Sequence, residues 1–305
     1  MDERWQEWVG RQGEVVLGPY PVSVAAIGYV AEAVEDALLL ERIASTGLEV
    51  APVTFVNVAA RVPNWQPPSI KQAPMLLAAS VPLPTDAAVN RRVAQRYLLP
   101  LRIGDTVSSQ STIVAIEPKR TRLGDGFLVT EQIEHRNQLG ELIATTVNTA
   151  YRYDRSTGGG GRSDPRPDGP PPEPASVPTL EGLRPVTLSV TGTMLVRAAG
   201  GVRDFIPLHH DVEVAQRSGL PTTFASWATL LAFVGRAVGE WFGLESSVRG
   251  VALDMRRPVF LGRTLTCEAR RTVATDGGGA VVDFALRTED GTCTVGAIEV
   301  ELPSG

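Results

Sequence analysis

The chain has 305 residues, 43% of them hydrophobic and 21% charged, a balance typical of a globular protein with its own core. Its net charge of −5 argues against general binding to nucleic acid or to an anionic membrane. The charged first residues and the lack of an apolar run of membrane-spanning length predict a cytoplasmic protein.

In chain order, the first elements predicted are a helix and then long strands. A helix-like stretch opens at residues 53–55, and a proline-marked segment at 100–107 introduces a strand. Two strand-like runs follow, at 126–134 and 142–153, on either side of a predicted turn. His135 lies in that turn, has no evident partner, and is given no role.

Residues 156–183 differ in composition from the rest of the chain. They contain four consecutive glycines and a proline-rich run, with almost nothing apolar to bury. We expect a flexible linker here, which separates an N-terminal half (residues 1–155) from a C-terminal half (residues 184–305).

The C-terminal half repeats features of the N-terminal half in the same order. Residues 100–107 return as 258–265, residues 53–55 as 222–224, and the turn 135–141 as 287–292, which lies between strand-like runs at 280–286 and 292–302. Apolar residues at three- and four-residue steps predict a long helix that starts near Thr223 and ends at Gly243. We therefore predict an α+β, tandem (double) hot-dog fold, in which each half wraps an antiparallel sheet around a long central helix.

Asp204 and His209 are the candidate catalytic residues. They lie in a segment that Pro207 breaks, so we expect a loop in which both side chains can converge. An imidazole assisted by a carboxylate is suited to activating water. Taken alone, the spacing would favour a hydrogen-bonded pair that only fixes the loop.

Residues 204–215 resemble the signature of the MaoC-like dehydratases and (R)-specific enoyl-CoA hydratases, Asp-x-Asn-Pro-Ile/Leu-His-x-Asp-x-x-x-Ala. The fixed residues are kept except for the asparagine, which is Ile206 here. Residues 51–55 are similar to the Ala-Pro-Pro-Thr-Phe of the non-catalytic repeat of that family. The resemblance implies a hydratase or dehydratase that acts on an enoyl or 3-hydroxyacyl thioester of coenzyme A or acyl carrier protein.

The resemblance also implies residue roles. His209 would take a proton from a water held with Asp204, and amides at the start of the central helix would receive the charge that develops on the thioester oxygen. The implied oxyanion and substrate-binding residues are Ile206, Thr222, Thr223, Phe224, Ala225 and Ser226. Arg256 and Arg257 could contact the phosphates of the thioester carrier, although paired arginines at a strand edge are also commonly solvated.

The N-terminal half offers an internal comparison. Residues 36–41 take the place of residues 204–209; Asp36 is kept, but Glu41 stands where the histidine would be. We expect one active site per chain, with the N-terminal half shaping the acyl pocket.

No metal or other cofactor is expected. His209, His210 and Asp211 are consecutive, and neighbouring side chains of an extended segment point to opposite faces. Asp211 is expected to cap a short helix at 212–217, and His210 to lie at the surface or at the pocket entrance. Cys267 and Cys293 are expected to be buried, reduced thiols.

Two alternative functions stay open. Ile206 and Trp227, the latter in place of a family glycine, would suit altered chemistry, such as a cyclase or isomerase of secondary metabolism. The chain could also be a non-catalytic acyl-binding or partner subunit.

Trp227 and Trp241 are expected in the core. The expected partner is an acyl-CoA or acyl-carrier-protein thioester, with no nucleic acid and no membrane, and the double fold allows a monomer or a homodimer.

Overall fold

The computed structural model describes residues 4–63, 65, 67, 76–158, 183–275 and 278–303. In these residues ten strands form one antiparallel sheet in the order β1-β3-β4-β5-β2-β7-β10-β9-β8-β6. The strands of the N-terminal half are β1 (Val16–Leu17), β2 (Ala87–Tyr97), β3 (Ser108–Thr121), β4 (Gly124–Arg136) and β5 (Leu142–Asp154). Those of the C-terminal half are β6 (Val186–Ser189), β7 (Ser247–Met255), β8 (Thr264–Ala274), β9 (Gly279–Thr288) and β10 (Gly291–Glu301).

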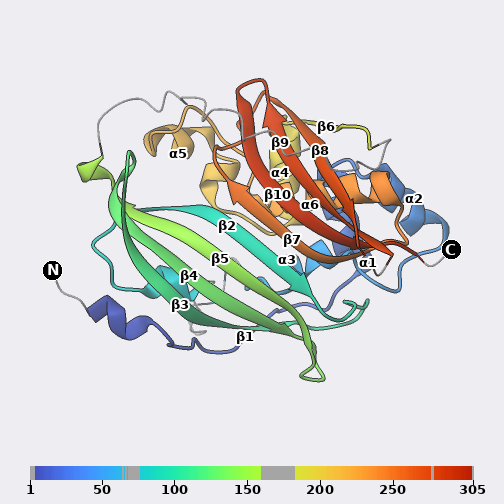
Figure 1. The fold of residues 1–305 in the computed structure, drawn as a ribbon, viewed down its shortest axis with the longest axis horizontal. Helices are drawn as coiled ribbons and strands as arrows, with labels where there is room; N and C mark the ends of the chain where they lie inside the picture. Colours follow the sequence, from blue (N-terminus) through green and yellow to red (C-terminus); the bar gives the residue numbers. More distant parts are fainter. Residues whose placement is uncertain are drawn as a thin grey trace.

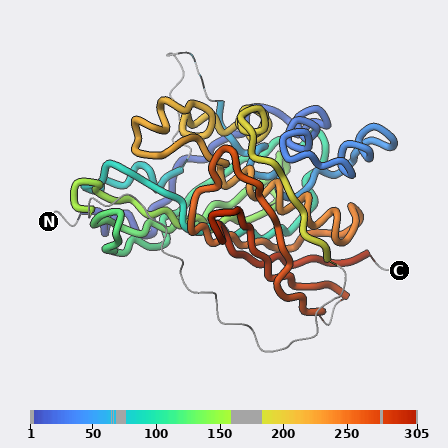
Figure 2. The backbone as a smooth tube through the Cα atoms, turned by 90° about the horizontal axis from the view of Figure 1, so that it is seen from above, coloured from blue at the N-terminus to red at the C-terminus, as the bar shows by residue number. Residues whose placement is uncertain are grey.

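The strand order has an approximate two-fold symmetry. The two halves meet where β2 pairs with β7, from Arg92 opposite Asp254 to Arg96 opposite Gly250 (Figure 1). Figure 2 shows the strands of the N-terminal half at one end of the molecule and those of the C-terminal half at the other. The two halves therefore share one sheet.

The helices lie mainly on one face of the sheet, toward its C-terminal half (Figure 1). They are α1 (Val24–Ala33), α2 (Ala37–Ser45), α3 (Val56–Ala59), α4 (Gly192–Gly201), α5 (Val212–Arg217) and α6 (Trp227–Phe242). On α6, Leu231, Phe233 and Val234 are buried in one core cluster with strand residues such as Phe284 and Leu286. Each such fully buried side chain stabilises the fold by about 1.5–3 kcal/mol.

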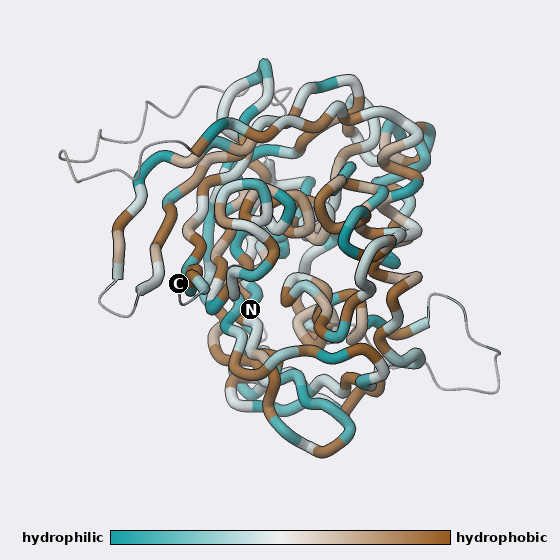
Figure 3. Tube along the Cα trace, turned by 90° about the vertical axis from the view of Figure 1, so that its right-hand side faces the viewer, coloured by the Kyte–Doolittle hydropathy of each residue, from teal (hydrophilic) through white to brown (hydrophobic). Residues whose placement is uncertain are grey.

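Burial alternates along the strands. In β4 nearly every second residue is buried, which matches the period of side chains on a pleated strand. Figure 3 shows the same alternation of apolar and polar residues along the tube. The predicted runs at 126–134, 142–153, 280–286 and 292–302 lie within β4, β5, β9 and, except for residue 302, β10.

The internal duplication is visible in the backbone. Asp36 and Asp204 each follow a residue of positive φ, Glu35 at 55° and Arg203 at 56°. The amide of each aspartate donates at 2.9 Å to the carbonyl five residues earlier, Ala31 or Ala199. The two aspartates are therefore equivalent positions, as the sequence comparison predicts.

One predicted equivalence is wrong. The isolated bridges pair Val50 with Arg102 and Phe224 with Phe260, so Phe224 corresponds to Val50 and not to Phe55. In the same register Val53 corresponds to Trp227, the first residue of α6. The Thr-Phe dipeptide that both halves share gave the wrong alignment, because bridge pairing, and not residue identity, sets the register.

The long central helix is confirmed only in the C-terminal half. It begins at Trp227, not near Thr223, and it ends before Gly243, whose φ of 81° suits glycine. In the N-terminal half, the corresponding described segment is a 3₁₀ turn (Val53–Phe55) followed by the four-residue α3. Pro63 and Pro67 follow soon after, and proline lacks the amide hydrogen that a helix needs.

Other predictions concern single segments. Residues 159–182 of the predicted linker lie outside the described residues, and Arg155–Thr157 forms a short 3₁₀ turn. Cys267 and Cys293 are both free and buried. Trp227 and Trp241 pack against the core cluster. In the described part of the chain, no helix has the length and apolar character needed to cross a membrane.

Candidate active site

The end of α4 positions Asp204. After the helix ends at Gly201, the positive φ of Arg203 turns the chain so that Asp204 is only 2% exposed. The chain then continues through a 3₁₀ turn, Pro207–His209, with Pro207 at its start. This turn places the His209 side chain, which is also buried, on the same side as Asp204.

Asp204 and His209 lie close together, as predicted. His209 Nε2 is 4.0 Å from Asp204 Oδ2, and His209 Nδ1 is 2.9 Å from the carbonyl oxygen of Phe224. A carbonyl can only accept, so Nδ1 carries the proton in neutral His209 and Nε2 presents its lone pair toward the carboxylate. The Phe224 ring also contacts the imidazole edge-on, with centroids 4.8 Å apart.

The surroundings favour a neutral imidazole at His209. Burial lowers the pKa of His209 below its usual 6.5, because desolvation disfavours the cation; the Asp204 carboxylate opposes this effect in part. A neutral imidazole with a free lone pair is the form that can accept a proton from water.

Arg61, which the sequence reasoning missed, completes the group. Its Nη2 donates to Asp204 Oδ2 at 3.0 Å, and both side chains are buried. The side chain of Arg203 donates to the backbone carbonyls of Arg61 and Val62, which fixes the segment that carries Arg61. Arg61 and Asp204 are 143 residues apart, and no local pattern signals a contact between two halves of a duplicated chain.

The predicted oxyanion residues do not all offer free amides. The Ala225 amide is occupied, because it donates to the Val259 carbonyl at 2.9 Å. In the same stretch the Thr223 carbonyl accepts from the Leu261 amide. Ser226 caps α6, its side chain accepting from the Thr229 amide. The first-turn amides of α6 belong to Trp227 and Ala228, one turn later than expected.

The remaining predicted residues, Ile206, Arg256 and Arg257, are more exposed than Asp204 and His209. Ile206 is 44% exposed, beside the equally exposed Phe205. Arg257 donates to the Asp290 carbonyl in the turn between β9 and β10, and Arg256 is exposed. The structure does not bring these two arginines into a described contact with Asp204 or His209.

The neighbouring residues match their predicted structural roles. His210 is exposed, and the Asp211 side chain accepts from the Val214 amide as the N-cap of α5. In the N-terminal half, Asp36 caps α2 and Glu41 is exposed on that helix, so the two do not form a pair like Asp204 and His209. No cluster of three or more metal-ligating side chains occurs within the described ranges.

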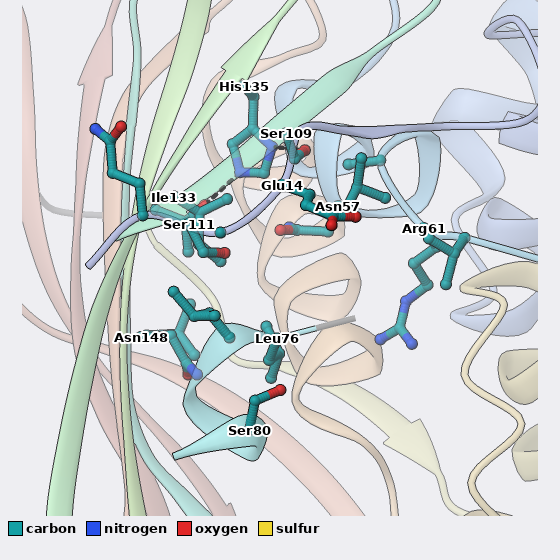
Figure 4. A pocket seen from close by; sticks show the side chains of 18 of the residues that line it. Glu14, Asn57, Arg61, Leu76, Ser80, Ser109, Ser111, Ile133, His135 and Asn148 are labelled. Atoms are coloured by element: carbon teal, nitrogen blue, oxygen red, sulfur yellow. Dashed lines mark hydrogen bonds between the residues drawn. The ribbon is translucent and has the colours of Figure 1, made fainter. Parts of the chain in front are cut away.

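A cavity of about 310 Å³ lies in the N-terminal half, beside the short helix α3 (Figure 4). Arg61 and Trp227 line it, which places the cavity next to the Asp204 group. His135 also lines it and is not in a turn: it lies in β4, is 3% exposed and contacts Ser109 and Thr146. The earlier placement in a turn was wrong because β4 runs two residues past the predicted end.

The chain is similar to known proteins. Residues 179–291 match the model of the family described as MaoC like domain. A chain of Thermomonospora curvata, named probable enoyl-CoA hydratase alpha subunit, is 33% identical over 159 residues, which are 47% of this chain and 49% of that one. The match thus spans about half the length of this relative.

Solved structures resemble the chain over nearly its whole length. One described as a MaoC-like dehydratase superposes with a TM-score of 0.75 at 18% identity, over 98% of this chain and all of the other. A Mycobacterium tuberculosis protein described as having a double hot-dog fold gives 0.61 at 14% identity, over 97% of each chain. The predicted double hot-dog fold is confirmed, and residues 179–291 of the C-terminal half are similar to the MaoC like domain.

Proposed function

We propose that the protein is a hydratase or dehydratase that adds water to an enoyl thioester or removes it from a 3-hydroxyacyl thioester. One observation carries the proposal: the Nε2 lone pair of His209 faces Asp204 Oδ2 across 4.0 Å. Two acceptors at that separation suit one water molecule, which can donate a hydrogen to each. The family match and the enoyl-CoA hydratase name of the relative support the same reaction.

In the proposed reaction His209 takes a proton from that water through Nε2. The hydroxide adds to the β-carbon of the enoyl thioester, and electron density moves to the thioester oxygen. The proton is then returned to the α-carbon, which restores the neutral imidazole and balances the atoms. Elimination follows the same steps in reverse.

The negative charge on the thioester oxygen needs hydrogen-bond donors. The first-turn amides of α6 have no partner within the helix and lie at the positive end of its dipole. His209 forms a hydrogen bond with the Phe224 carbonyl, and Phe224 precedes the first residue of α6 by three positions. The proposed base is therefore tied to the segment that leads into these amides. We assign the oxyanion role to the Trp227 and Ala228 amides.

The roles of the other groups follow from their positions. Arg61 holds the Asp204 carboxylate and supplies positive charge beside it. The cavity lined by Arg61 and Trp227 would take the acyl group, and the exposed Phe205 and Ile206 would flank the entrance. The carrier is coenzyme A or an acyl carrier protein, and no metal or redox cofactor takes part in the proposed steps.

Turnover of trans-2-enoyl-CoA and 3-hydroxyacyl-CoA thioesters of several chain lengths tests the proposal, followed by enoyl absorbance and mass spectrometry. His209→Ala should lower kcat/KM by about 10²-fold or more, since a positioned base contributes about 10²- to 10⁴-fold. His210→Ala removes the neighbouring, exposed imidazole and should leave kcat/KM unchanged. Absence of turnover by the wild type across CoA and carrier-protein thioesters would contradict the hydratase function.

A further inference from the structure

The cavity in the N-terminal half has an unusual polar wall. Ser109 and Ser111 on β3, His135 on β4, and Thr146 and Asn148 on β5 all line it (Figure 4). These residues lie on the same face of the sheet, the face that lines the cavity. Buried polar groups cost free energy unless they are hydrogen-bonded.

The C-terminal half shows that the fold does not require this polarity. Ser109 corresponds to Cys267 in the repeat, and His135, which pairs with Ser109, corresponds to Leu286, which pairs with Cys267. By the same register, Thr146 and Gln95 correspond to Gly296 and Leu253. One half thus packs an apolar face against α6, while the other leaves a polar face open to a cavity.

The polar side chains form one chain of hydrogen bonds. Gln95 Nε2 is 2.7 Å from Asn57 Oδ1 and 2.8 Å from Thr146 Oγ1. Thr146 Oγ1 is 2.9 Å from His135 Nε2, and His135 Nδ1 is 2.8 Å from Ser109 Oγ. This series of hydrogen bonds connects Gln95 on β2 with Ser109 on β3, at the wall of the cavity.

One assignment of donors fits all of these bonds. Gln95 uses both hydrogens of its amide nitrogen, so the Thr146 oxygen accepts one of them, and we assign the Thr146 hydroxyl hydrogen to His135 Nε2. His135 is neutral, since burial lowers its pKa to about 4, and in this assignment its single hydrogen lies on Nδ1 and is donated to Ser109. The hydroxyl hydrogen of Ser109 then remains as a donor at the cavity.

The rest of the cavity decides what that donor can meet. Its walls include Trp8, Leu76, Val93 and Trp227, which suit hydrocarbon. Glu14 lines the same space, and an acidic side chain gives no attraction for an anionic group (Figure 4). Of the arginines that line it, Arg61 is paired with Asp204 and Arg11 lies over the Trp8 ring.

We propose that this cavity binds the far end of an acyl group that carries a neutral, hydrogen-bond-accepting oxygen, such as a keto group, and that Ser109 donates to that oxygen. The proposal rests on the proposed function, because it assumes that the thioester lies at Asp204 and His209. An acyl group without the oxygen would leave the Ser109 donor unpaired, which is how a polar site rejects an apolar analogue.

Calorimetry with saturated acyl-CoA thioesters tests this without requiring turnover. The probes are straight-chain thioesters of six to twelve carbons, each with and without a keto group on the penultimate carbon. At the best length, the wild type should bind the keto thioester about five- to tenfold tighter than its unsubstituted partner, as expected for one net hydrogen bond.

Ser109→Ala should remove that preference, whereas Ser108→Ala, the same change on the opposite face of β3, should keep it. Equal affinity of the wild type for both members of every pair, or no binding of either, overturns the proposal. A keto preference that survives in Ser109→Ala overturns it as well. The hydratase function is judged separately by enoyl turnover, so the two can fail independently.

Discussion

The guanidinium of Arg61 donates to Asp204 Oδ2 at 3.0 Å, and it does so from the opposite half of the chain. Asp204 is 3% and Arg61 8% exposed in their side chains, so neither charge is well solvated. The carboxylate that faces His209 is therefore held by the half that carries no Asp–His pair of its own. This contact joins the two halves at the proposed active site.

Replacement of Arg61 by methionine should lower the free energy of unfolding by about 3–5 kcal/mol, because it leaves a buried carboxylate without its partner. Denaturant titration measures the loss. Arg92→Met is the matched control, since Arg92 also bridges the halves, to Asp254 at 2.9 Å, but from an exposed position. That control should lose at most about 1 kcal/mol. Equal losses would show that the buried Arg61–Asp204 pair contributes no more to the free energy of unfolding than the exposed Arg92–Asp254 pair.

The pH dependence of turnover should reflect the environment of His209. Its pKa is lowered from 6.5 by burial, and the neutral form is the proposed base. Activity should therefore stay constant as the pH falls through 6.5 and decline only at lower pH, where the imidazole gains a proton. The profile of kcat/KM against pH for an enoyl-CoA reports this group in the free enzyme. An acidic limb at or above pH 6.5 would argue against His209 as the base.

His135 should make the fold less stable in acid. The unfolded chain binds a proton at this histidine below a pH near 6.5, whereas the folded chain does so only near 4. Stability is thus full above the unfolded pKa and falls as the pH drops from about 6.5 to about 4, by roughly 3 kcal/mol at 1.36 kcal/mol per pKa unit.

Thermal or denaturant unfolding across that range measures the change. His135→Gln keeps a donor and an acceptor but does not titrate, so its stability should depend less steeply on pH. A curve for His135→Gln as steep as that of the wild type would assign the acid sensitivity to other groups.

Two adjacent glycines at the end of α4 should respond differently to alanine. A Cβ on Gly201 would lie 2.8 Å from the Tyr29 carbonyl of α1, while one on Gly200 would meet nothing within 4 Å. Gly201→Ala must push α4 from α1 and should cost about 1–3 kcal/mol, and it should also reduce turnover because Asp204 follows three residues later. Gly200→Ala should be neutral or stabilising by up to about 1 kcal/mol. Parallel unfolding curves and kcat values for the two variants check this.

Much of the site could be predicted from the sequence because its parts are local. Asp204, Pro207 and His209 lie within six residues, and a proline-broken loop brings such side chains together whatever surrounds it. The Asp211 cap of α5, the end of α6 at Gly243 and four of the long strands depend on equally local rules of capping and alternation. The duplication itself could be predicted because the proline-marked segment before a strand occurs in both halves, at residues 100–107 and 258–265.

Other features depend on contacts between distant segments of the chain. These features became visible only in the tertiary structure. Arg61 reaches Asp204 because β2 and β7 join the halves into one sheet and Arg203 binds the carbonyls of Arg61 and Val62. The register of Phe224 was misread because bridge pairing with Phe260 sets it. His135 seemed partnerless because Ser109 and Thr146 meet it across strands, and hydrogen bonds of that kind leave no period in the sequence.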